Sequence, residues 1–437
     1  TTTTTTTTAT TTTPPPATAP NIVIINVDDA RVEALEVMPK SMSWFADGGT
    51  NFVNSYVSTP SCCPSRATLM TGQYVHNNGQ VDQDTPSTDQ DDSIQRLLSD
   101  AGYFTSHSGK YLHWLPLADT APYWDRWTYF KGSYNNVWTN FDGNVQLSPT
   151  YSTIMTFESA MEHAESFDAL NDDRPFYLHI APVAPHKPYD PEPQYADAPV
   201  PTWNPNPSVG EADRSDKPIW VRYLNKTPAQ GAADRESQLR LMMTVDDQVD
   251  RLMARLTELG EADNTIAIFT SDNGYFWSEH GRNSKFLPYN EAVEVPFLVR
   301  WPGQVGAGAT STDLVSHVDI LPTVLAAADV TPGHVVDGRD ILDPGFARSD
   351  LLTEYWEDEA NANLIPDWSS IRNEARVYTE YYDDNNVVIA REYYDLTSDP
   401  WELVNLLGDG NPSNDPDTAA VAADLAAYRS CSGSSCR

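Results

Sequence analysis

A cysteine pair and an arginine lie close together in the sequence Cys-Cys-Pro-Ser-Arg that begins at Cys62. Pro64 suits the first turn of a helix, and Gly72 suits the position just after the end of a short one. Cys62 and Cys63 would then lie at a helix N-terminus, where free backbone N–H groups favour an anion and lower the pKa of a thiol. Arg66 adds a forked cation one turn later. This pattern indicates a nucleophile for an oxyanion ester, or alternatively a buried cysteine pair that begins an ordinary helix.

Two clusters of carboxylate and amide side chains follow runs of β-branched residues. Asp28 and Asp29 come directly after the first run, and Asp272 and Asn273 follow a later one. Paired acids at such places can form a turn and a helix cap, or they can be hard oxygen ligands for Ca²⁺ or Mg²⁺. Because these clusters contain oxygen ligands without grouped His or Cys, they favour a hard divalent cation over zinc.

Several cations and histidines complete the set of candidate residues. Lys110 and His113 are close in sequence, His186 precedes Lys187, and Lys285 follows the second carboxylate cluster. Each of these residues, taken alone, would more often be an ordinary surface residue. Together with a metal ion and an arginine, they would form a pocket for a dianionic oxyester. A histidine with an ordinary pKa of about 6.5 could deliver a proton to the leaving alkoxide.

Strands and helices that alternate over residues 21–330 predict the architecture. Buried strands are expected at 21–27, 176–180, 265–270 and 295–300, and helices at 94–101, 152–170 and 235–260. This alternation predicts an α/β sandwich with a mostly parallel sheet, whose carboxyl edge would hold the ligand site. Near the C-terminus a hairpin (378–382 and 387–394) and a helix (419–428) predict a smaller antiparallel subdomain.

The composition of the chain suggests its division into domains and its cellular location. Residues 1–20 are rich in Thr and Pro and are expected to be a disordered linker, followed by a catalytic domain (21–345) and a smaller C-terminal subdomain (346–437). No apolar run approaches the ~20 residues of a membrane helix, so we expect no transmembrane segment. Cys431 and Cys436 enclose Ser-Gly-Ser-Ser, a loop that a disulfide could close in an oxidising compartment. We therefore expect a secreted, cell-surface or periplasmic protein.

The formal net charge is −35, from 62 acidic and 27 basic residues. A field of this sign repels nucleic acid and argues against DNA or RNA as a partner. It would also repel a polyanionic substrate, so any anion site must be a local basic pocket. A more ordinary role of such an acidic surface is solubility in salt.

The motifs, in their order along the chain, resemble those of the type I sulfatases. The sequence from Cys62 to Arg66, followed by Thr71-Gly72, resembles the family signature of the form Cys-x-Pro-Ser-Arg. Further matches are Asp28-Asp29, Gly109-Lys110, His186, Ser271-Asp272-Asn273-Gly274, and a C-terminal stretch from Tyr394 to Leu406. The resemblance is strongest to the branch of the N-acetylglucosamine-6-sulfatases and heparan endosulfatases, and to bacterial sulfatases. It implies an α/β fold like that of alkaline phosphatase.

The resemblance also implies roles for individual residues. Cys62 would be converted to formylglycine by a formylglycine-generating enzyme, and its hydrated aldehyde would attack sulfur. Ca²⁺, with Mg²⁺ as an alternative, would be bound by Asp28, Asp29, Cys62, Asp272 and Asn273. The sulfate would be bound by Arg66, Lys110, His186 and Lys285, with His186 and Lys285 near the leaving oxygen. His113 would be the base, although many relatives place that histidine one residue nearer the lysine.

The expected activity is release of sulfate from a sulfated sugar, such as a glycan 6-O-sulfate, or from an aryl sulfate. Two alternatives stay open: a phosphodiesterase or phosphonate monoester hydrolase of the same superfamily, and a non-catalytic glycan-binding relative. The aromatic stretch 114–141 and the long loop 188–218 are expected to decide the substrate. We expect the rings of the aromatic stretch to pack under a long loop, although such rings can also stack on sugars.

Overall fold

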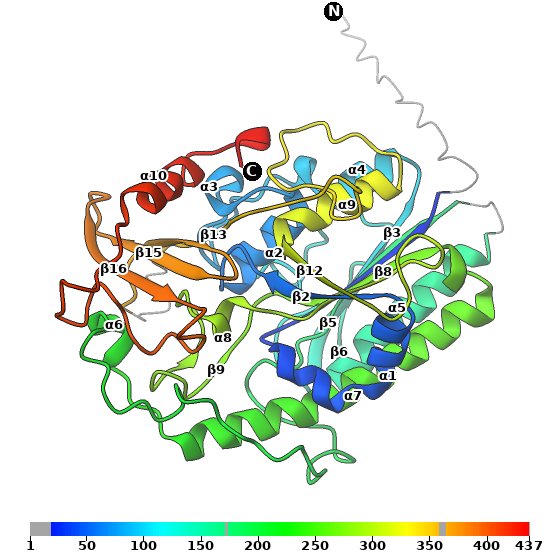
Figure 1. Ribbon diagram of the computed structural model, residues 1–437. Helices are drawn as coiled ribbons and strands as arrows, with labels where there is room; N and C mark the ends of the chain where they lie inside the picture. The colour runs from blue at the N-terminus through cyan, green and yellow to red at the C-terminus, as the bar shows by residue number, and fades with distance from the viewer. Residues whose placement is uncertain (1–18, 171–173, 358–363, 437) are drawn as a thin grey trace, which may run out of the picture.

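The computed structural model describes residues 19–170, 174–357 and 364–436, so most of the expected linker, residues 1–18, lies outside it. A large mixed sheet forms the centre of the molecule, and a smaller antiparallel sheet lies at one end (Figure 1). Along the described chain, every helix is too short or too polar to cross a membrane. The predicted α/β sandwich with a smaller C-terminal sheet is confirmed.

The large sheet has its parallel strands at the centre. The order of its strands is β12-β2-β11-β8-β1-β7-β3-β4-β5-β6. Strands β8, β1, β7, β3 and β4 run parallel, whereas β11, β5 and β6 pair antiparallel with their neighbours. The strand bounds are β1 (Asn21–Val27), β2 (Thr50–Tyr56), β3 (Phe104–Gly109), β4 (Arg126–Phe130), β5 (Val137–Phe141), β6 (Asn144–Ser148), β7 (Phe176–Ala181), β8 (Thr265–Ser271), β11 (Phe297–Arg300) and β12 (Ala309–Ser316).

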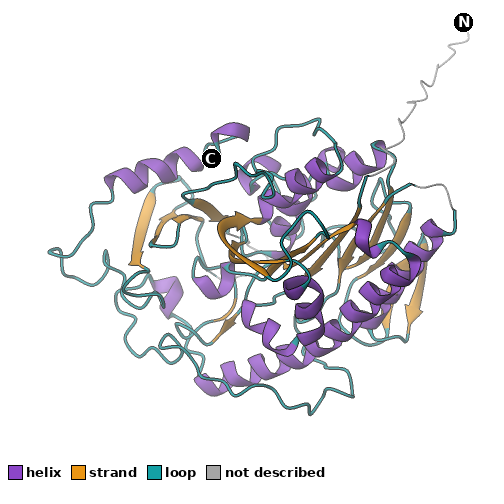
Figure 2. Cartoon of the chain, turned by 45° about the vertical axis from the view of Figure 1, so that its right-hand side comes forward, coloured by secondary structure: helices purple, strands orange, loops and turns teal. Residues whose placement is uncertain are grey.

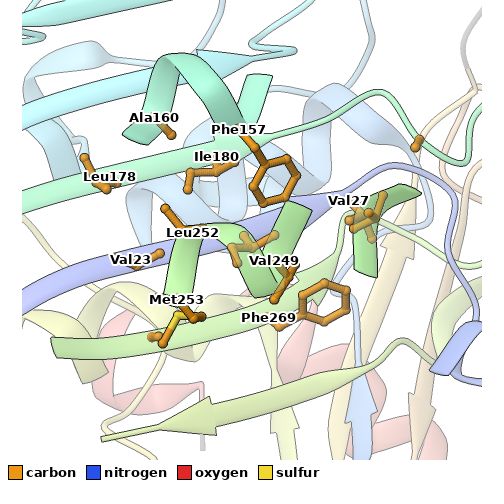
Figure 3. Packing of buried hydrophobic residues seen from close by; sticks show 14 of the residues in the cluster. Val23, Val27, Phe157, Ala160, Leu178, Ile180, Val249, Leu252, Met253 and Phe269 are labelled. Atoms are coloured by element: carbon orange, nitrogen blue, oxygen red, sulfur yellow. The ribbon is translucent and has the colours of Figure 1, made fainter. Parts of the chain in front are cut away.

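Helices cover both faces of this sheet, as Figure 2 shows. One face packs against α5 (Ser152–Asp168) and α7 (Pro228–Leu259), and the other against α2 (Cys62–Thr71), α4 (Ile94–Asp100) and α9 (Ile320–Ala327). Alternate side chains of β1 enter the two cores because neighbouring residues of a strand point to opposite faces. Figure 3 shows the first core, which includes Val23, Val27, Phe157, Ala160, Leu178, Ile180, Val249, Leu252, Met253 and Phe269.

The second sheet contains β13 (Leu351–Tyr355), β14 (Trp368–Arg372), β15 (Arg376–Tyr382) and β16 (Val388–Asp395), all antiparallel. Helix α10 (Ala419–Tyr428) has the predicted bounds, and a disulfide joins Cys431 to Cys436. The other short elements are α1 (Pro39–Met42), α3 (Val75–Asn78), α6 (Ile219–Arg222), α8 (Asn290–Val293), β9 (Phe276–Trp277) and β10 (Asn283–Ser284). The predicted hairpin corresponds to β15 and β16, two strands of this four-stranded sheet.

Two predictions from local pattern were wrong. Helix α7 begins at Pro228, earlier than expected, because a capping box between Thr227 and Gln230 starts it without any apolar periodicity. The aromatic stretch holds strands β4 and β5, so its rings do not simply pack under a loop. Trp127, in β4, is buried in the second core, whereas Trp138, in β5, is exposed.

Gly109 ends β3 and precedes Lys110, and it leaves no room for a side chain. Its φ is +113°, and a Cβ atom there would lie 2.1 Å from the carbonyl oxygen of Ala181. Gly143 is a matched control, because its φ is +88° with nothing within 4 Å of a Cβ. We expect Gly143→Ala to lower the free energy of unfolding by about 1–2 kcal/mol, from backbone strain alone. Gly109→Ala should lower it by roughly 4 kcal/mol or more. Equal losses in denaturant unfolding would contradict this close packing.

Candidate active site

The register of the parallel strands brings the candidate residues to one edge of the sheet. Val27 is paired with Ser271, so Asp28 and Asp272, which follow them, are neighbours. Strands β3 and β7 end side by side, and Lys110 directly follows β3. The loop after β7 carries His186 to the same edge. Segments far apart in sequence therefore converge, as expected for the carboxyl edge of a parallel sheet.

Asp28 and Asp29 are buried, with hydrogen bonds that orient each one. The Asp28 N–H donates to the carbonyl oxygen of Ala184 (3.0 Å), and the Asp29 N–H donates to Oδ1 of Asp272 (3.2 Å). The φ of Asp29 is +70°, a left-handed conformation that a short polar residue tolerates. Asn273 donates from Nδ2 to Oδ1 of Asp29 (2.6 Å). The two carboxylates are thus held in fixed directions at the base of the site.

Cys62 is the first residue of α2, and its sulfur lies between a lysine and a carboxylate. Nζ of Lys285 donates to Sγ of Cys62 (2.8 Å), and that sulfur is 3.6 Å from Oδ1 of Asp28. The expected helix is confirmed: Pro64 lies in its first turn, and Gly72 follows its end with φ +65°. The neighbouring Cys63 instead packs in the second core.

Arg66 and the two lysines neutralise the carboxylates. Arg66 donates from Nε to Asp272 (2.9 Å) and from Nη1 to the carbonyl oxygen of Lys110 (2.9 Å). Lys110 forms an ion pair with Asp28, and Lys285 forms one with Asp29. Burial by itself would raise the carboxyl pKa of these two aspartates, but the paired lysines hold both pKa values below the ordinary range.

The pKa of the Cys62 thiol differs from the expectation. A helix N-terminus lowers a thiol pKa, yet burial raises that of Cys62 to about 12, against the opposing effect of Lys110 and Lys285. Desolvation of the charged form is the larger effect because the residue is almost completely enclosed. An unmodified Cys62 would therefore be a protonated, weakly nucleophilic thiol near neutral pH.

The two candidate histidines differ in their position and in their exposure to solvent. Nε2 of His186 is 3.8 Å from Oδ2 of Asp29, inside the group of buried charges. His113 is exposed on the rim, where its Nδ1 is 2.9 Å from Oδ1 of Asp84. Both histidines line the same cavity of about 710 Å³. The structure thus brings all the candidate residues to one site, with His113 at its outer edge.

The cavity also contains residues that no sequence motif indicated. Gln83 accepts from the N–H of Cys63 (3.1 Å) and donates to Ser61 (2.6 Å), so it fixes the start of α2. Lys131, Tyr275 and Phe286 form other parts of the wall. Each comes from a loop without a recognisable pattern, and only the folded chain places them beside the site.

Several residues at this edge could together hold a metal ion. Asp28, Asp29, Cys62 and His186 each offer one ligand atom, and these atoms all lie within 4.8 Å of one another. Oδ1 of Asn273 is fully buried and has no hydrogen-bond partner among the described residues. A buried oxygen without a partner is costly, and a cation would satisfy it. Carboxylate and amide oxygens are the ligands that Ca²⁺ and Mg²⁺ prefer.

Comparison with known proteins identifies the family. The sulfatase family model matches residues 20–330, which is more than half of the chain. This chain belongs to the sulfatase family. A second model, for the C-terminal region of N-sulphoglucosamine sulphohydrolase, matches residues 278–427.

Curated sulfatases from animals are similar to this member of the family. The extracellular sulfatase SULF-1 homolog of Drosophila melanogaster is 33% identical over 364 residues, which cover 78% of this chain but only 32% of that protein. Human N-acetylglucosamine-6-sulfatase is 27% identical, over 96% of this chain and 86% of its own. The resemblance to this branch is thereby confirmed.

Solved structures confirm the fold. BT4656 in complex with its substrate D-glucosamine-2-N,6-O-disulfate has a TM-score of 0.75 at 24% identity, covering 93% of this sulfatase and 96% of that chain. A phosphonate monoester hydrolase of Agrobacterium radiobacter has a TM-score of 0.73 at 21% identity, covering 93% and 94%. Because the two scores are nearly equal, the fold by itself does not separate sulfate from phosphonate chemistry.

Proposed function

We propose that this protein is a Ca²⁺-dependent sulfuric ester hydrolase that releases sulfate from a sulfated sugar, such as a glycan 6-O-sulfate, or from an aryl sulfate. The placement of Cys62 carries the proposal. Its sulfur lies at the base of a cavity, next to Lys285 and Asp28, inside the family signature. The names of the similar proteins, an N-acetylglucosamine-6-sulfatase among them, support the sugar class.

Two groups would complete this site. Conversion of Cys62 to formylglycine by a generating enzyme would supply a hydrated aldehyde as the nucleophile toward sulfur, where the unmodified thiol is buried and protonated. Ca²⁺, or Mg²⁺ in its place, would be held by residue 62 together with Asp28, Asp29, Asp272 and Asn273. When bound, the cation would polarise oxygen ligands and neutralise negative charge.

The cations of the chain would hold the sulfate. Arg66, Lys110, His186 and Lys285 are the proposed ligands, and the last two would lie near the leaving oxygen. Arg66 and Lys285 are almost completely buried, so their charges act through little water. This set gives a strong local attraction for the anionic sulfate group inside an acidic protein.

The hydrogen bonds of His186 indicate which ring nitrogen moves the proton. Nδ1 lies 2.6 Å from the carbonyl oxygen of Lys187, which can only accept, so Nδ1 carries a hydrogen. Nε2, which lies 3.8 Å from Oδ2 of Asp29, is then the nitrogen that could give a proton to the leaving oxygen. We keep His113 as the proposed base, because it lines the same cavity.

We also propose that residues 21–345 form the catalytic domain, with 346–437 as the smaller subdomain, in a protein exported by a bacterium. The disulfide between Cys431 and Cys436 and the extracellular sulfatase relative support export. The strands of the second sheet begin at Leu351, near the proposed division.

Turnover of matched esters tests the function. The full chain, produced together with a formylglycine-generating enzyme, would be assayed with 4-nitrophenyl sulfate, N-acetylglucosamine-6-sulfate, bis(4-nitrophenyl) phosphate and phenyl phosphonate. We expect higher kcat/KM for the sulfate esters. Faster phosphodiester or phosphonate cleavage would favour the hydrolase represented by the Agrobacterium structure. An unmodified Cys62 in the purified protein, together with no turnover of any of these esters, would indicate a non-catalytic glycan-binding protein.

A further inference from the structure

The loop that follows β7 carries His186, and the imidazole of this residue is only partly enclosed. Its side chain is 34% exposed, so packing against neighbouring side chains does not by itself fix the place of the ring. The backbone of residues 182–190, which carries the ring, contains neither helix nor strand. Within this loop the N–H of His186 donates to the carbonyl oxygen of Val183 (2.8 Å), and the carbonyl oxygen of Ala184 accepts from the N–H of Asp28 (3.0 Å). The position of the imidazole therefore depends on whatever else holds this backbone.

Two buried tyrosines from other elements hold the loop by its carbonyl oxygens. The hydroxyl of Tyr134, from the segment between β4 and β5, donates to the carbonyl oxygen of His186 (2.6 Å). The hydroxyl of Tyr151, just before α5, donates to the carbonyl oxygen of Asp190 (3.0 Å). The two rings stack, with their centroids 5.4 Å apart and their planes inclined by 20°. One tyrosine thus contacts the residue that is proposed to move a proton, and the other contacts the same loop further along.

Tyr134 has the properties of a rigid anchor. Its side chain is completely buried in the first core, and its own carbonyl oxygen accepts from the N–H of Ser152 (2.8 Å), the first residue of α5. Burial raises the pKa of the phenol well above its ordinary value, so the hydroxyl keeps its hydrogen and remains a donor. The hydrogen bond from Tyr134 therefore joins the backbone of His186 to the core and to the start of α5.

The acceptor of this hydrogen bond lies on the residue whose ring has to be aimed. Because the N–H of His186 is held by Val183 and its carbonyl oxygen by Tyr134, the direction of its side chain from the backbone is set. The hydrogen bond from Nδ1 to the carbonyl oxygen of Lys187 (2.6 Å) then sets the rotation of the ring. Nε2 is the nitrogen that remains, and it lies 3.8 Å from Oδ2 of Asp29. Loss of the Tyr134 hydroxyl would release one of these constraints and leave the others in place.

We propose that Tyr134 is a positioning residue that holds Nε2 of His186 toward the leaving oxygen of the ester. Tyr134 does not line the catalytic cavity, so it acts through the carbonyl oxygen of His186 and not by contact with the ester. Proton transfer requires a donor within hydrogen-bond reach, and a small displacement of the donor costs most where the leaving group needs the proton most. This inference rests on the proposed function and adds to it a residue outside the catalytic cavity.

The dependence of the rate on the leaving group tests the inference. 4-Nitrophenolate leaves readily without a proton, whereas 4-methoxyphenolate is a poorer leaving group and gains more from one. In Tyr134→Phe we expect the ratio of kcat/KM for 4-methoxyphenyl sulfate over 4-nitrophenyl sulfate to fall at least about tenfold. A merely structural hydrogen bond would lower the Tm but leave this ratio unchanged, and that result would overturn the inference.

Tyr151→Phe is the matched control for this experiment. It removes the same hydroxyl from the neighbouring stacked ring, and it frees a carbonyl oxygen of the same loop, that of Asp190. Because each variant loses one hydrogen bond from a buried tyrosine, we expect similar falls in Tm for the two. The ratio of kcat/KM should stay within about twofold of the unaltered enzyme in Tyr151→Phe. An equal fall of the ratio in both variants would contradict a specific role of Tyr134.

An NMR measurement separates this inference from the hydrolase assignment, because it needs no turnover. In protein made with isotopically labelled histidine, the ring signals of His186 are assigned as those missing from His186→Gln. We expect these signals to broaden or divide in Tyr134→Phe and to stay single in Tyr151→Phe. Unchanged signals in Tyr134→Phe would overturn the inference even in an active enzyme. Altered signals in a protein whose unaltered form releases no sulfate would contradict the hydrolase assignment alone.

Discussion

Replacement of Cys62 by alanine is expected to lower kcat for sulfate esters by about 10³-fold or more. The side chain of residue 62 lies 2.8 Å from Nζ of Lys285 and lines the catalytic cavity. If residue 62 is the nucleophile, the remaining cations still bind sulfate but have nothing to attack it. Steady-state kinetics with 4-nitrophenyl sulfate measure the loss, and circular dichroism verifies that the variant is folded.

Cys63→Ala provides a matched control for this experiment. Cys63 is equally buried, but it packs in the second core and does not line the catalytic cavity. Its replacement keeps the Cys-x-Pro-Ser-Arg pattern, and we expect kcat within about threefold of the unaltered enzyme. Peptide mass analysis should find the CH2SH side chain of residue 62 converted to an aldehyde, CHO, which has oxygen in place of sulfur and two hydrogens fewer. A free thiol at Cys62 in the active enzyme would refute the assignment of the nucleophile.

Removal of the metal is expected to have the second large effect. EDTA should abolish sulfate release and added Ca²⁺ should restore it, because two buried aspartates and the oxygen of Asn273 fit a cation. Since the ion binds only the folded site, Ca²⁺ at 100 times its Kd should raise the Tm of EDTA-treated protein by about 3 °C. Thermal unfolding measures this rise without any assay of activity.

Asp28→Asn tests which residues are responsible for that rise. The change keeps the shape of the side chain but removes one charged ligand, so we expect the Ca²⁺-dependent rise in Tm to fall below about 1 °C. Asp84→Asn is the control: it removes the same charge from the exposed rim of the same cavity. A full rise in the Asp28 variant, or its loss in the Asp84 variant, would show that Ca²⁺ binds elsewhere.

The sequence alone determined the strands that form the sheet and the residues that follow them. Buried β-branched runs predict central parallel strands, and the carboxyl ends of such strands must meet at one edge. That rule is enough to bring Asp28 to Asp272 without knowledge of any side-chain contact. The position of Cys62 at the start of a helix was also predictable from the sequence, because Pro64 and Gly72 mark the start and end of that helix.

The tertiary structure decided what surrounds those residues. Lys285 contacts Cys62 although the two residues are 223 positions apart in the sequence, and no local sequence pattern predicts that contact. Whether the pKa of a thiol at a helix start is lowered or raised depends on its burial. That burial depends on all the segments that pack over the thiol. Local propensity and strand order act over neighbouring residues, whereas desolvation and charge pairing depend on distances that only the folded chain sets.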